Sequence, residues 1–315
     1  MRDHGGNLDW ARARWGGTDW IDLSTGINRV PYPVGVVSPE AWTALPTRAA
    51  MAGLLAAARV AYSTSVPLIA LAGAQAAIQL IPRLSAPGLA RVLGPTYNEH
   101  AACLQAAGWR VEQVSDWRAL AGADLAVVVN PNNPGGQVVS KADLLGLLGS
   151  VGRLVVDESF ADVTPEMSVA GIDAPALIVL RSFGKFYGLA GVRLGFVIGS
   201  DSAALAEMAG PWAVSGAAIE IGTRALSDQS WSAATVARLR DDVARLDWMV
   251  GWPLDGGTAL FRLYRVDDAA ATQDRLARHG IWSRIFPYSR HWIRLGLPGS
   301  EAEFGRLSQA LSGDP

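Results

Sequence analysis

The sequence has little of several features that mark whole classes of protein. It contains one cysteine, Cys103, so no disulfide can form within the chain. Its 27 Lys and Arg residues nearly balance 29 Asp and Glu residues, which gives a formal net charge of -2. A chain without excess positive charge offers no general attraction to nucleic acid or to anionic lipid. We therefore expect neither nucleic acid nor a membrane surface as a partner.

Long apolar runs and targeting signals are also missing. The most apolar window, residues 66–84, contains Gln75, Gln79, Arg83 and two prolines, which a membrane-spanning helix would tolerate poorly. The first residues are polar and lack the basic and apolar regions of a signal peptide. We predict a cytoplasmic protein without a membrane span.

Common motifs for metal and nucleotide binding are absent as well. The sequence has no HExxH, CxxC or GxGxxG motif, and no Walker lysine after a glycine loop. No GxSxG motif is present to anchor a serine hydrolase. The histidines are scattered along the chain at His4, His100, His279 and His291. We expect no bound metal.

What the sequence does contain is an alternation of strand-like and helix-like segments. Short aliphatic runs, which are typical of buried strands, occur at 68–71, 91–93, 125–129, 154–156, 176–180 and 194–198. Ala- and Leu-rich stretches separate them, which predicts an α/β large domain over residues 37–211, with a mostly parallel sheet flanked by helices. Beyond it, longer helices come before separate strands. We expect residues 1–36 and 212–315 to form a smaller α+β domain.

Three polar motifs follow these strand-like runs, at the positions where α/β sheets build their sites. They are NPNNPGG at 130–136, VVDESF at 155–160 and RSFGKFYGLAGVRLG at 181–195. In this order the motifs resemble the fold type I pyridoxal 5'-phosphate aminotransferase superfamily over essentially the whole chain. The resemblance implies an aspartate aminotransferase-like fold, pyridoxal 5'-phosphate as cofactor, and a homodimer whose sites lie at the subunit boundary.

Two residues carry the chemistry that such a cofactor needs. It requires an amine for its aldehyde and an anion beside its pyridine nitrogen. Lys185 lies in an apolar, glycine-flanked stretch, which is not a typical surface position for a lysine. Asp157 ends a predicted buried strand, where alone it fits a structural acid equally well. The resemblance implies that Lys185 is the Schiff-base lysine and that Asp157 is the partner of the pyridine nitrogen.

The resemblance also implies the rest of the cofactor site. The residues concerned are Gly73, Ala74, Gln75, Tyr97, Asn133, Ser182 and Arg193. The turn 73–75, Ser182 and Arg193 would bind the phosphate, because backbone N–H groups, a hydroxyl and a cation suit a dianion. Tyr97 would stack on the ring, and Asn133 would bond the ring hydroxyl oxygen. Without the resemblance, Asn133 fits an ordinary turn and Tyr97 an ordinary core residue.

Further motifs resemble one branch of the superfamily, the threonine-phosphate decarboxylases of cobalamin biosynthesis. They are HGGN at 4–7, LSTGIN at 23–28, and Phe160, where related transaminases carry tyrosine. This resemblance implies decarboxylation of L-threonine O-3-phosphate to (R)-1-amino-2-propanol O-2-phosphate. The implied substrate-binding residues are His4, Gly5, Asn28, Arg284 and Arg294.

The sequence departs from that pattern in three places, one of which is the phosphate turn, where Gly73-Ala74-Gln75 stands instead of a Gly-Glu-Thr type of sequence. Leu45 stands where relatives carry a tyrosine that reaches the neighbouring subunit, and Gly26 stands where they carry an asparagine. Each missing donor weakens binding by roughly 1.5–3 kcal/mol. Two alternatives therefore stay open. The chain could be an aminotransferase such as a histidinol-phosphate aminotransferase, or a weakly active subunit that works with another cobalamin-assembly protein.

Overall fold

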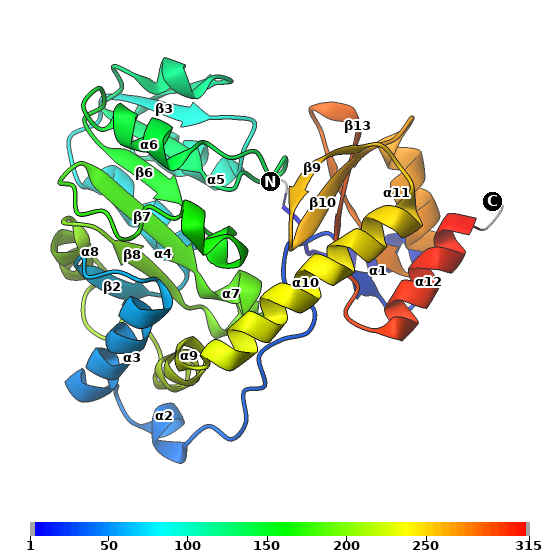
Figure 1. The fold of residues 1–315 in the computed structure, drawn as a ribbon, viewed down its shortest axis with the longest axis horizontal. Coiled ribbons are helices and arrows are strands. Elements are labelled where there is room, and N and C mark those ends of the chain that lie inside the picture. The colour runs from blue at the N-terminus through cyan, green and yellow to red at the C-terminus, as the bar shows by residue number, and fades with distance from the viewer. Residues whose placement is uncertain (1–3, 313–315) are drawn as a thin grey trace. The chain divides into compact units, whose positions relative to one another are not determined.

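The computed structural model describes residues 4–312, which form two compact units (Figure 1). The larger unit comprises Tyr32–Asn133 and Gln137–Ser232. The smaller unit comprises the described residues up to Pro31, the turn Pro134–Gly136, and the chain from Ala233 onward. Residues 212–232 pack with the larger unit, because helix α9 (Gly216–Ser227) lies against α3 (Arg48–Ala61). The domain limits drawn from composition stay a prediction.

The larger unit is built on one sheet, which has seven strands among the described residues. Their order is β2 (Leu68–Leu71), β8 (Gly195–Ile198), β7 (Leu177–Ser182), β6 (Leu154–Asp157), β5 (Leu125–Val129), β3 (Leu89–Leu93) and β4 (Arg110–Val114). The pairs from β7 to β4 are parallel, and β8 is antiparallel to both of its neighbours. The predicted α/β fold with a mostly parallel sheet is confirmed.

Buried β-branched residues explain the centre of this sheet. All five residues of β5 and all four of β6 are buried, as expected for strands covered on both faces. The remaining helices of the unit are α2 (Pro39–Thr43), α4 (Ala74–Leu80), α5 (Asn98–Ala106), α6 (Lys141–Leu147), α7 (Phe183–Phe186) and α8 (Ser202–Ala209). Helix α4 packs on β7 and β8 and also contacts α5 and α8. The sheet is therefore a rigid support for the residues at its edge.

The smaller unit is an α+β arrangement. Its antiparallel sheet has the order β12 (Arg284–Phe286), β13 (Ser289–Gly296), β10 (Phe261–Arg265) and β9 (Leu254–Thr258), and β1 (Ile21–Asp22) pairs in parallel with β11 (Ile281–Trp282). Its helices are α1 (Leu8–Trp15), α11 (Ala269–Arg278) and α12 (Glu301–Ser312), together with most of α10 (Gln229–Val250). Strand β9 was not predicted, because its two glycines give it a low strand propensity.

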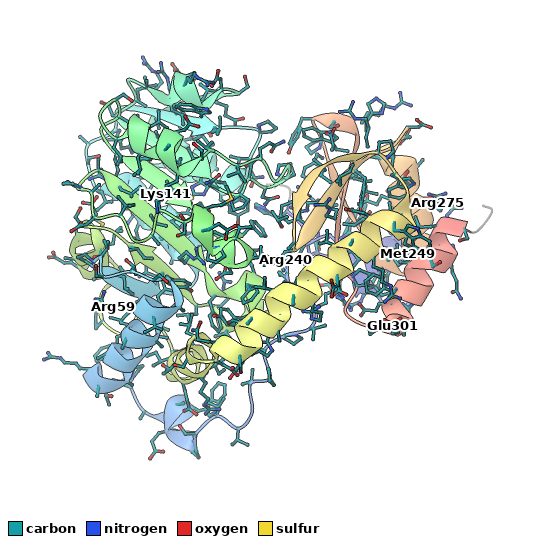
Figure 2. All side chains as sticks on the ribbon, viewed as in Figure 1. Arg59, Lys141, Arg240, Met249, Arg275 and Glu301 are labelled. Carbon is teal, nitrogen blue, oxygen red and sulfur yellow. The ribbon has the colours of Figure 1, made fainter. Side chains whose placement is uncertain are left out.

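The described helices carry many exposed charged side chains. Charged side chains such as Lys141, Arg240 and Glu301 are exposed (Figure 2). Among residues 4–312, no helix combines the length and the apolar character needed to cross a bilayer. Within the same residues, no cluster of three or more His, Cys, Asp or Glu side chains is arranged to hold a metal ion.

Candidate active site

A cavity of about 130 Å³ opens where strands β5, β6 and β7 of the larger unit end. These neighbouring strands are parallel, so their carboxyl ends meet at one edge of the sheet, where α/β proteins place their sites. The cavity is lined by Ala74, Gln75, Ile78, Tyr97, Val129, Asn133, Asp157, Ser159, Phe160, Ser182, Lys185 and Arg193. Eight of the nine residues predicted for the cofactor are among them, and the ninth, Gly73, directly precedes Ala74.

Asp157 is a buried carboxylate with three hydrogen-bond donors. Its Oδ2 atom lies 2.8 Å from Nε2 of His100, and its Oδ1 atom accepts bonds from the backbone N–H (3.0 Å) and the hydroxyl (2.5 Å) of Ser159. Burial raises the pKa of Asp157, but the hydrogen bond and charge of His100, with the bonds from Ser159, lower it by more. The pKa of Asp157 therefore lies below its ordinary value, and the cavity contains a fixed negative charge.

His100 and Ser159 were not singled out from the sequence. A buried histidine on a helix gives no signal by itself, and Ser159 reads as part of a turn. The one available clue is spacing, because His100 follows Tyr97 by three residues and so lies on the same side of the chain at the start of α5. The structure makes both residues partners of Asp157.

Lys185 lies in the short helix α7, immediately after β7. Its Nζ atom is 5.7 Å from the centre of the buried Phe160 ring. A Cβ atom on the preceding Gly184 would lie 2.8 Å from the Cα atom of Ala190, so only glycine allows α7 to approach that segment. Beneath the helix, the rings of Phe183 and Tyr187 stack with their centres 4.5 Å apart. The backbone that carries the lysine amine is thus tightly packed.

The turn before α4 meets a guanidinium group. Gly73 has φ of +83°, and a Cβ atom placed there would lie 2.7 Å from Nη2 of Arg193. The arginine itself is held by a hydrogen bond of 3.1 Å from Nη1 to the carbonyl of Ala190. Its side chain therefore lies directly against the backbone that opens α4, which brings a cation and backbone N–H groups together.

Tyr97 closes another side of the cavity. Its hydroxyl donates to Oε1 of Gln75 at 3.2 Å, and Nε2 of Gln75 donates to Oε2 of Glu99 at 3.1 Å. Burial, followed by the charges of Glu99 and Asp157, raises the pKa of Tyr97 to about 12. The phenol stays protonated at neutral pH, so Gln75 is fixed between Tyr97 and Glu99.

The residues predicted to bind substrate all lie in the smaller unit. Arg294 on β13 is paired in register with Arg284 on β12, and its Nη2 atom donates to the carbonyl of Ser24 at 2.6 Å. Burial, and then the charge of Arg284, lower the pKa of Arg294. A cation in this setting is stabilised by a bound anion.

The other three predicted substrate residues lie in the N-terminal part of this unit. Gly5 lies against the backbone of Ser24, and His4, which precedes it, is exposed. Asn28 is buried, and its Oδ1 atom accepts a bond of 2.8 Å from Nη2 of Arg238 on α10. The structure therefore brings Gly5 and Arg294 to the same residue, Ser24, and gives Asn28 a separate partner.

Two of the departures from the family pattern, Leu45 and Gly26, occupy different surroundings. Leu45 is 64% exposed and lines an apolar groove of about 450 Å³ in the larger unit, between α2, α3 and α9. Gly26 is buried in the smaller unit. Val36 and Trp42 add further exposed apolar side chains to the segment that contains Leu45, at 87% and 67% exposure.

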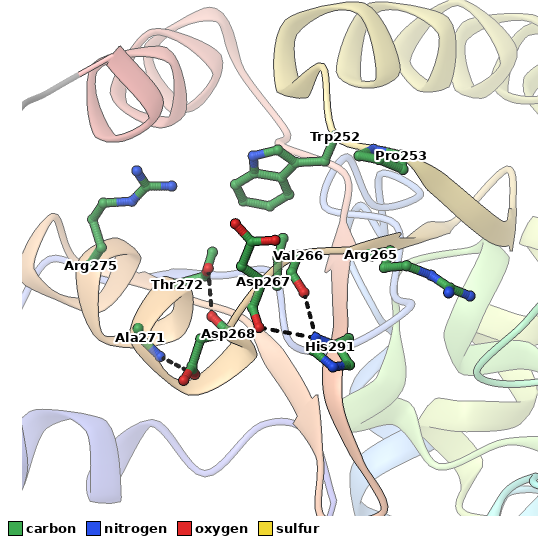
Figure 3. A pocket seen from close by; sticks show the side chains of 10 residues that line it. All are labelled: Trp252, Pro253, Arg265, Val266, Asp267, Asp268, Ala271, Thr272, Arg275 and His291. Atoms are coloured by element: carbon green, nitrogen blue, oxygen red, sulfur yellow. Dashed lines mark hydrogen bonds between the residues drawn. The ribbon is translucent and has the colours of Figure 1, made fainter.

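A larger cavity, of about 780 Å³, lies in the smaller unit and contains none of the predicted site residues (Figure 3). Several of its polar groups have partners in the local fold. Nδ1 of His291 lies within 3.1 Å of the carbonyls of Val266 and Asp267, Asp268 accepts bonds from two N–H groups in the first turn of α11, and Arg265 pairs with Asp255. Arg275 also lines the cavity, and its Nε atom is buried without a hydrogen-bond partner.

Comparison with known proteins gives matches along nearly the whole chain. The family model named "Aminotransferase class I and II" matches residues 39–311. A threonine-phosphate decarboxylase of Pseudomonas aeruginosa is 43% identical, with 99% of this chain and 98% of that protein covered. One from a Sinorhizobium species is also 43% identical, with 98% and 97% covered.

Solved structures with the same fold include a histidinol-phosphate aminotransferase and a threonine-phosphate decarboxylase. The first is the enzyme of Sinorhizobium meliloti, solved in complex with pyridoxal 5'-phosphate. It matches with a TM-score of 0.79 and 20% identity, over 96% of this chain and 92% of that chain. The L-threonine-O-3-phosphate decarboxylase of Porphyromonas gingivalis has a TM-score of 0.70 and 19% identity, with 87% and 94% covered. At these identities the likeness concerns the fold.

Proposed function

Because this chain belongs to the aminotransferase class I and II family, we propose that it is a pyridoxal 5'-phosphate enzyme that decarboxylates L-threonine O-3-phosphate. The product is (R)-1-amino-2-propanol O-2-phosphate, the aminopropanol linker of cobalamin biosynthesis. One observation carries the choice of reaction: two threonine-phosphate decarboxylases are 43% identical to this chain over almost its entire length. Histidinol-phosphate aminotransferases match less of it, for example at 29% identity over 70% of the chain.

The donor set of the cavity at the sheet edge suits this cofactor. An ionised carboxylate, an amine and a guanidinium line one cavity, contributed by Asp157, Lys185 and Arg193. The glycine turn at Gly73 leaves space that a Cβ atom would fill. When bound, pyridoxal 5'-phosphate supplies an electron sink for the negative charge that develops at the substrate Cα atom. We assign the phosphate to the turn 73–75, Ser182 and Arg193.

The remaining residues of the cavity then have distinct tasks. With the cofactor bound, Asp157 would pair with the pyridine nitrogen, because its lowered pKa keeps it ionised. Lys185 Nζ would hold the cofactor and would supply a proton to the substrate Cα atom. Tyr97 would lie against the ring, and Asn133 would donate a hydrogen bond to the ring hydroxyl oxygen. Phe160, whose ring centre is 5.7 Å from Nζ, shields the amine from water.

The substrate carries two anionic groups, and the smaller unit contributes two neighbouring cations. We assign the substrate carboxylate to Arg294 and the substrate phosphate to Arg284 and His4, with Gly5 and Asn28 beside them. By holding the substrate carboxylate, Arg294 would orient the bonds at the substrate Cα atom, and this orientation would favour decarboxylation over transamination. Burial lowers the pKa of Arg294, so binding of the carboxylate anion stabilises its charge.

The proposal includes a homodimer. The apolar groove between α2, α3 and α9, with the exposed side chains of Val36, Trp42 and Leu45, is the surface that we assign to the second copy. Light scattering should give twice the chain mass for the wild type, and the chain mass for Trp42→Glu. A wild-type protein with the mass of one chain would contradict this assignment. We propose that the dimer acts without another cobalamin-assembly protein.

The test of the reaction uses the purified chain, pyridoxal 5'-phosphate and L-threonine O-3-phosphate. Trapped CO2 and aminopropanol phosphate, identified by mass spectrometry, are the expected products. Lys185→Ala should bind no cofactor covalently after borohydride reduction, and its rate should fall by about 10²–10⁴-fold. A keto product without CO2 would identify an aminotransferase instead. Activity that appears only with a second protein would support the partner-subunit alternative.

A further inference from the structure

We propose that Ser24 and Trp282 are positioning residues that clasp the N-terminal segment 4–7 and hold it in register with Arg294. We call this set of contacts the N-terminal clasp. The inference rests on the proposed function, because it takes His4 and Arg294 as the groups that bind the two ends of the substrate. All of its residues lie in the smaller unit.

The clasp grips Gly6 from two sides. The backbone N–H of Gly6 donates to the hydroxyl of Ser24 at 2.7 Å, and the indole N–H of Trp282 donates to the carbonyl of Gly6 at 2.8 Å. Both partners are buried, Ser24 completely and Trp282 to 8% exposure. The backbone N–H and the carbonyl of Gly6 are therefore both bonded to buried side chains.

Ser24 joins this turn to Arg294. Its hydroxyl donates to Oδ1 of Asp22 at 2.6 Å, which orients the hydroxyl oxygen to accept from Gly6. Its carbonyl accepts a bond of 2.6 Å from Nη2 of Arg294. A Cβ atom on Gly5 would overlap this same carbonyl, so only glycine lets the segment approach. One residue therefore sets the positions of both the segment and the arginine.

The strand register keeps the two clasping residues together. Strands β1 and β11 are parallel neighbours, with Asp22 paired to Trp282. The backbone N–H of Leu23 donates to the carbonyl of Trp282 at 2.8 Å, and the N–H of Gly296, at the end of β13, donates to the carbonyl of Leu23 at 2.7 Å. These bonds connect the N-terminal segment 4–7 through β1 and β11 to β13, the strand that carries Arg294.

A pair of matched tryptophan variants separates the clasp from general packing. Trp282 and Trp15 belong to one aromatic cluster, with ring centres 5.6 Å apart, but the indole of Trp15 donates to Asp274 instead of the N-terminal segment. Trp282→Phe removes the bond to Gly6 and keeps a ring, and Trp15→Phe removes an indole hydrogen bond to the carboxylate of Asp274. Ser24→Ala is the second variant, and it removes the hydroxyl that accepts the bond from the Gly6 N–H.

The kinetic readout is the division between KM and kcat. We expect Trp282→Phe to raise KM for L-threonine O-3-phosphate about three- to tenfold, the worth of one hydrogen bond, with kcat unchanged. Trp15→Phe should leave KM unchanged. In the Trp282→Phe background, His4→Ala should raise KM by less than it does in the wild type, because the histidine is already misplaced. An equal rise in KM for both tryptophan variants would overturn the proposal, since packing alone would explain it.

Hydrogen exchange on the substrate-free protein provides a readout independent of turnover. We expect the Gly6 amide to exchange at least about threefold faster in Trp282→Phe and in Ser24→Ala, and at the wild-type rate in Trp15→Phe. Unchanged exchange in the first two variants would overturn the clasp. Faster exchange with an unchanged KM would overturn its link to substrate binding. If the wild type forms no CO2, the proposed function fails, and hydrogen exchange still decides whether the clasp exists.

Discussion

Removing His100 tests how the protein maintains the charge of Asp157. In His100→Leu an apolar side chain replaces the ring at a position bordered by Ile78 and Leu104. Asp157 then keeps both donors of Ser159 and loses its bond to Nε2. A hydrogen bond to a charged group contributes about 1.5–3 kcal/mol. The pKa of Asp157 should therefore rise in the variant, because a bond that lowers it in the wild type is lost.

The sign of the effect on stability follows from the direction of the shift. In the wild type the folded pKa of Asp157 lies below the reference value of 3.8. The carboxylate therefore contributes stability that is fully present above that reference and is lost as the pH falls through the folded pKa. Raising the folded pKa reduces this contribution at pH 7 by about 1.5–3 kcal/mol. The difference in unfolding free energy between the variant and the wild type should narrow as the pH falls toward the folded pKa of Asp157.

Urea unfolding of the cofactor-free protein between pH 4 and pH 7 measures this difference. Ser159→Ala is the control, because it removes the hydroxyl bond to Oδ1 and keeps the bond from the backbone N–H. Titration with pyridoxal 5'-phosphate should show weaker binding in His100→Leu, since Asp157 is assigned to the pyridine nitrogen. An unfolding free energy equal to that of the wild type at pH 7, or a deficit that does not vary with pH, would refute the reasoning.

Two further substitutions test other parts of the larger unit. Gly73→Ala should weaken cofactor binding about 10- to 150-fold, because the new Cβ atom would lie 2.7 Å from Nη2 of Arg193, and loss of one charge-assisted bond has this magnitude. Equilibrium titration measures it, and Gly146→Ala, where nothing lies within 4 Å, should bind as the wild type does. Glu158→Gln removes one of the two buried carboxylates that pair with Arg181 (2.9 Å), while Asp162 remains, so urea unfolding should show a loss of about 1.5–3 kcal/mol, the worth of one charged hydrogen bond. A loss below 1 kcal/mol would contradict that estimate.

The central strands of the sheet could be predicted because they consist almost entirely of aliphatic residues, whereas the polar edge strand β4 was not predicted. The run 125–129 is aliphatic throughout, and β5 has those limits with every residue buried. Parallel pairing then brings the ends of β5, β6 and β7 to one edge, so Asp157 and Lys185, far apart in sequence, line one cavity. Periodicity and motif order are sufficient for this part of the site.

Residues that act through hydrogen bonds to distant segments could not be predicted in the same way. Trp282 is one of 12 tryptophans, and nothing in the sequence around it indicates that its indole N–H donates to the carbonyl of Gly6. Ser24 lies in a segment where any small polar residue fits a turn. Strand β9 escaped prediction because Gly256 and Gly257 remove the side-chain pattern on which strand prediction depends. Such contacts depend on segments that are distant in sequence.

The larger unit stabilises the charged form of Asp157, whereas the smaller unit destabilises the charged form of Arg294. Asp157 receives three hydrogen-bond donors from its own unit, so the protein stabilises its negative charge before any ligand binds. Arg294 is buried beside the cation of Arg284, and both effects lower its pKa, so the protein makes its positive charge costly. A bound carboxylate offsets that cost, and an uncharged analogue does not. We infer that the carboxylate of Asp157 is a fixed part of the cofactor site, whereas Arg294 discriminates between substrates through the anion they carry.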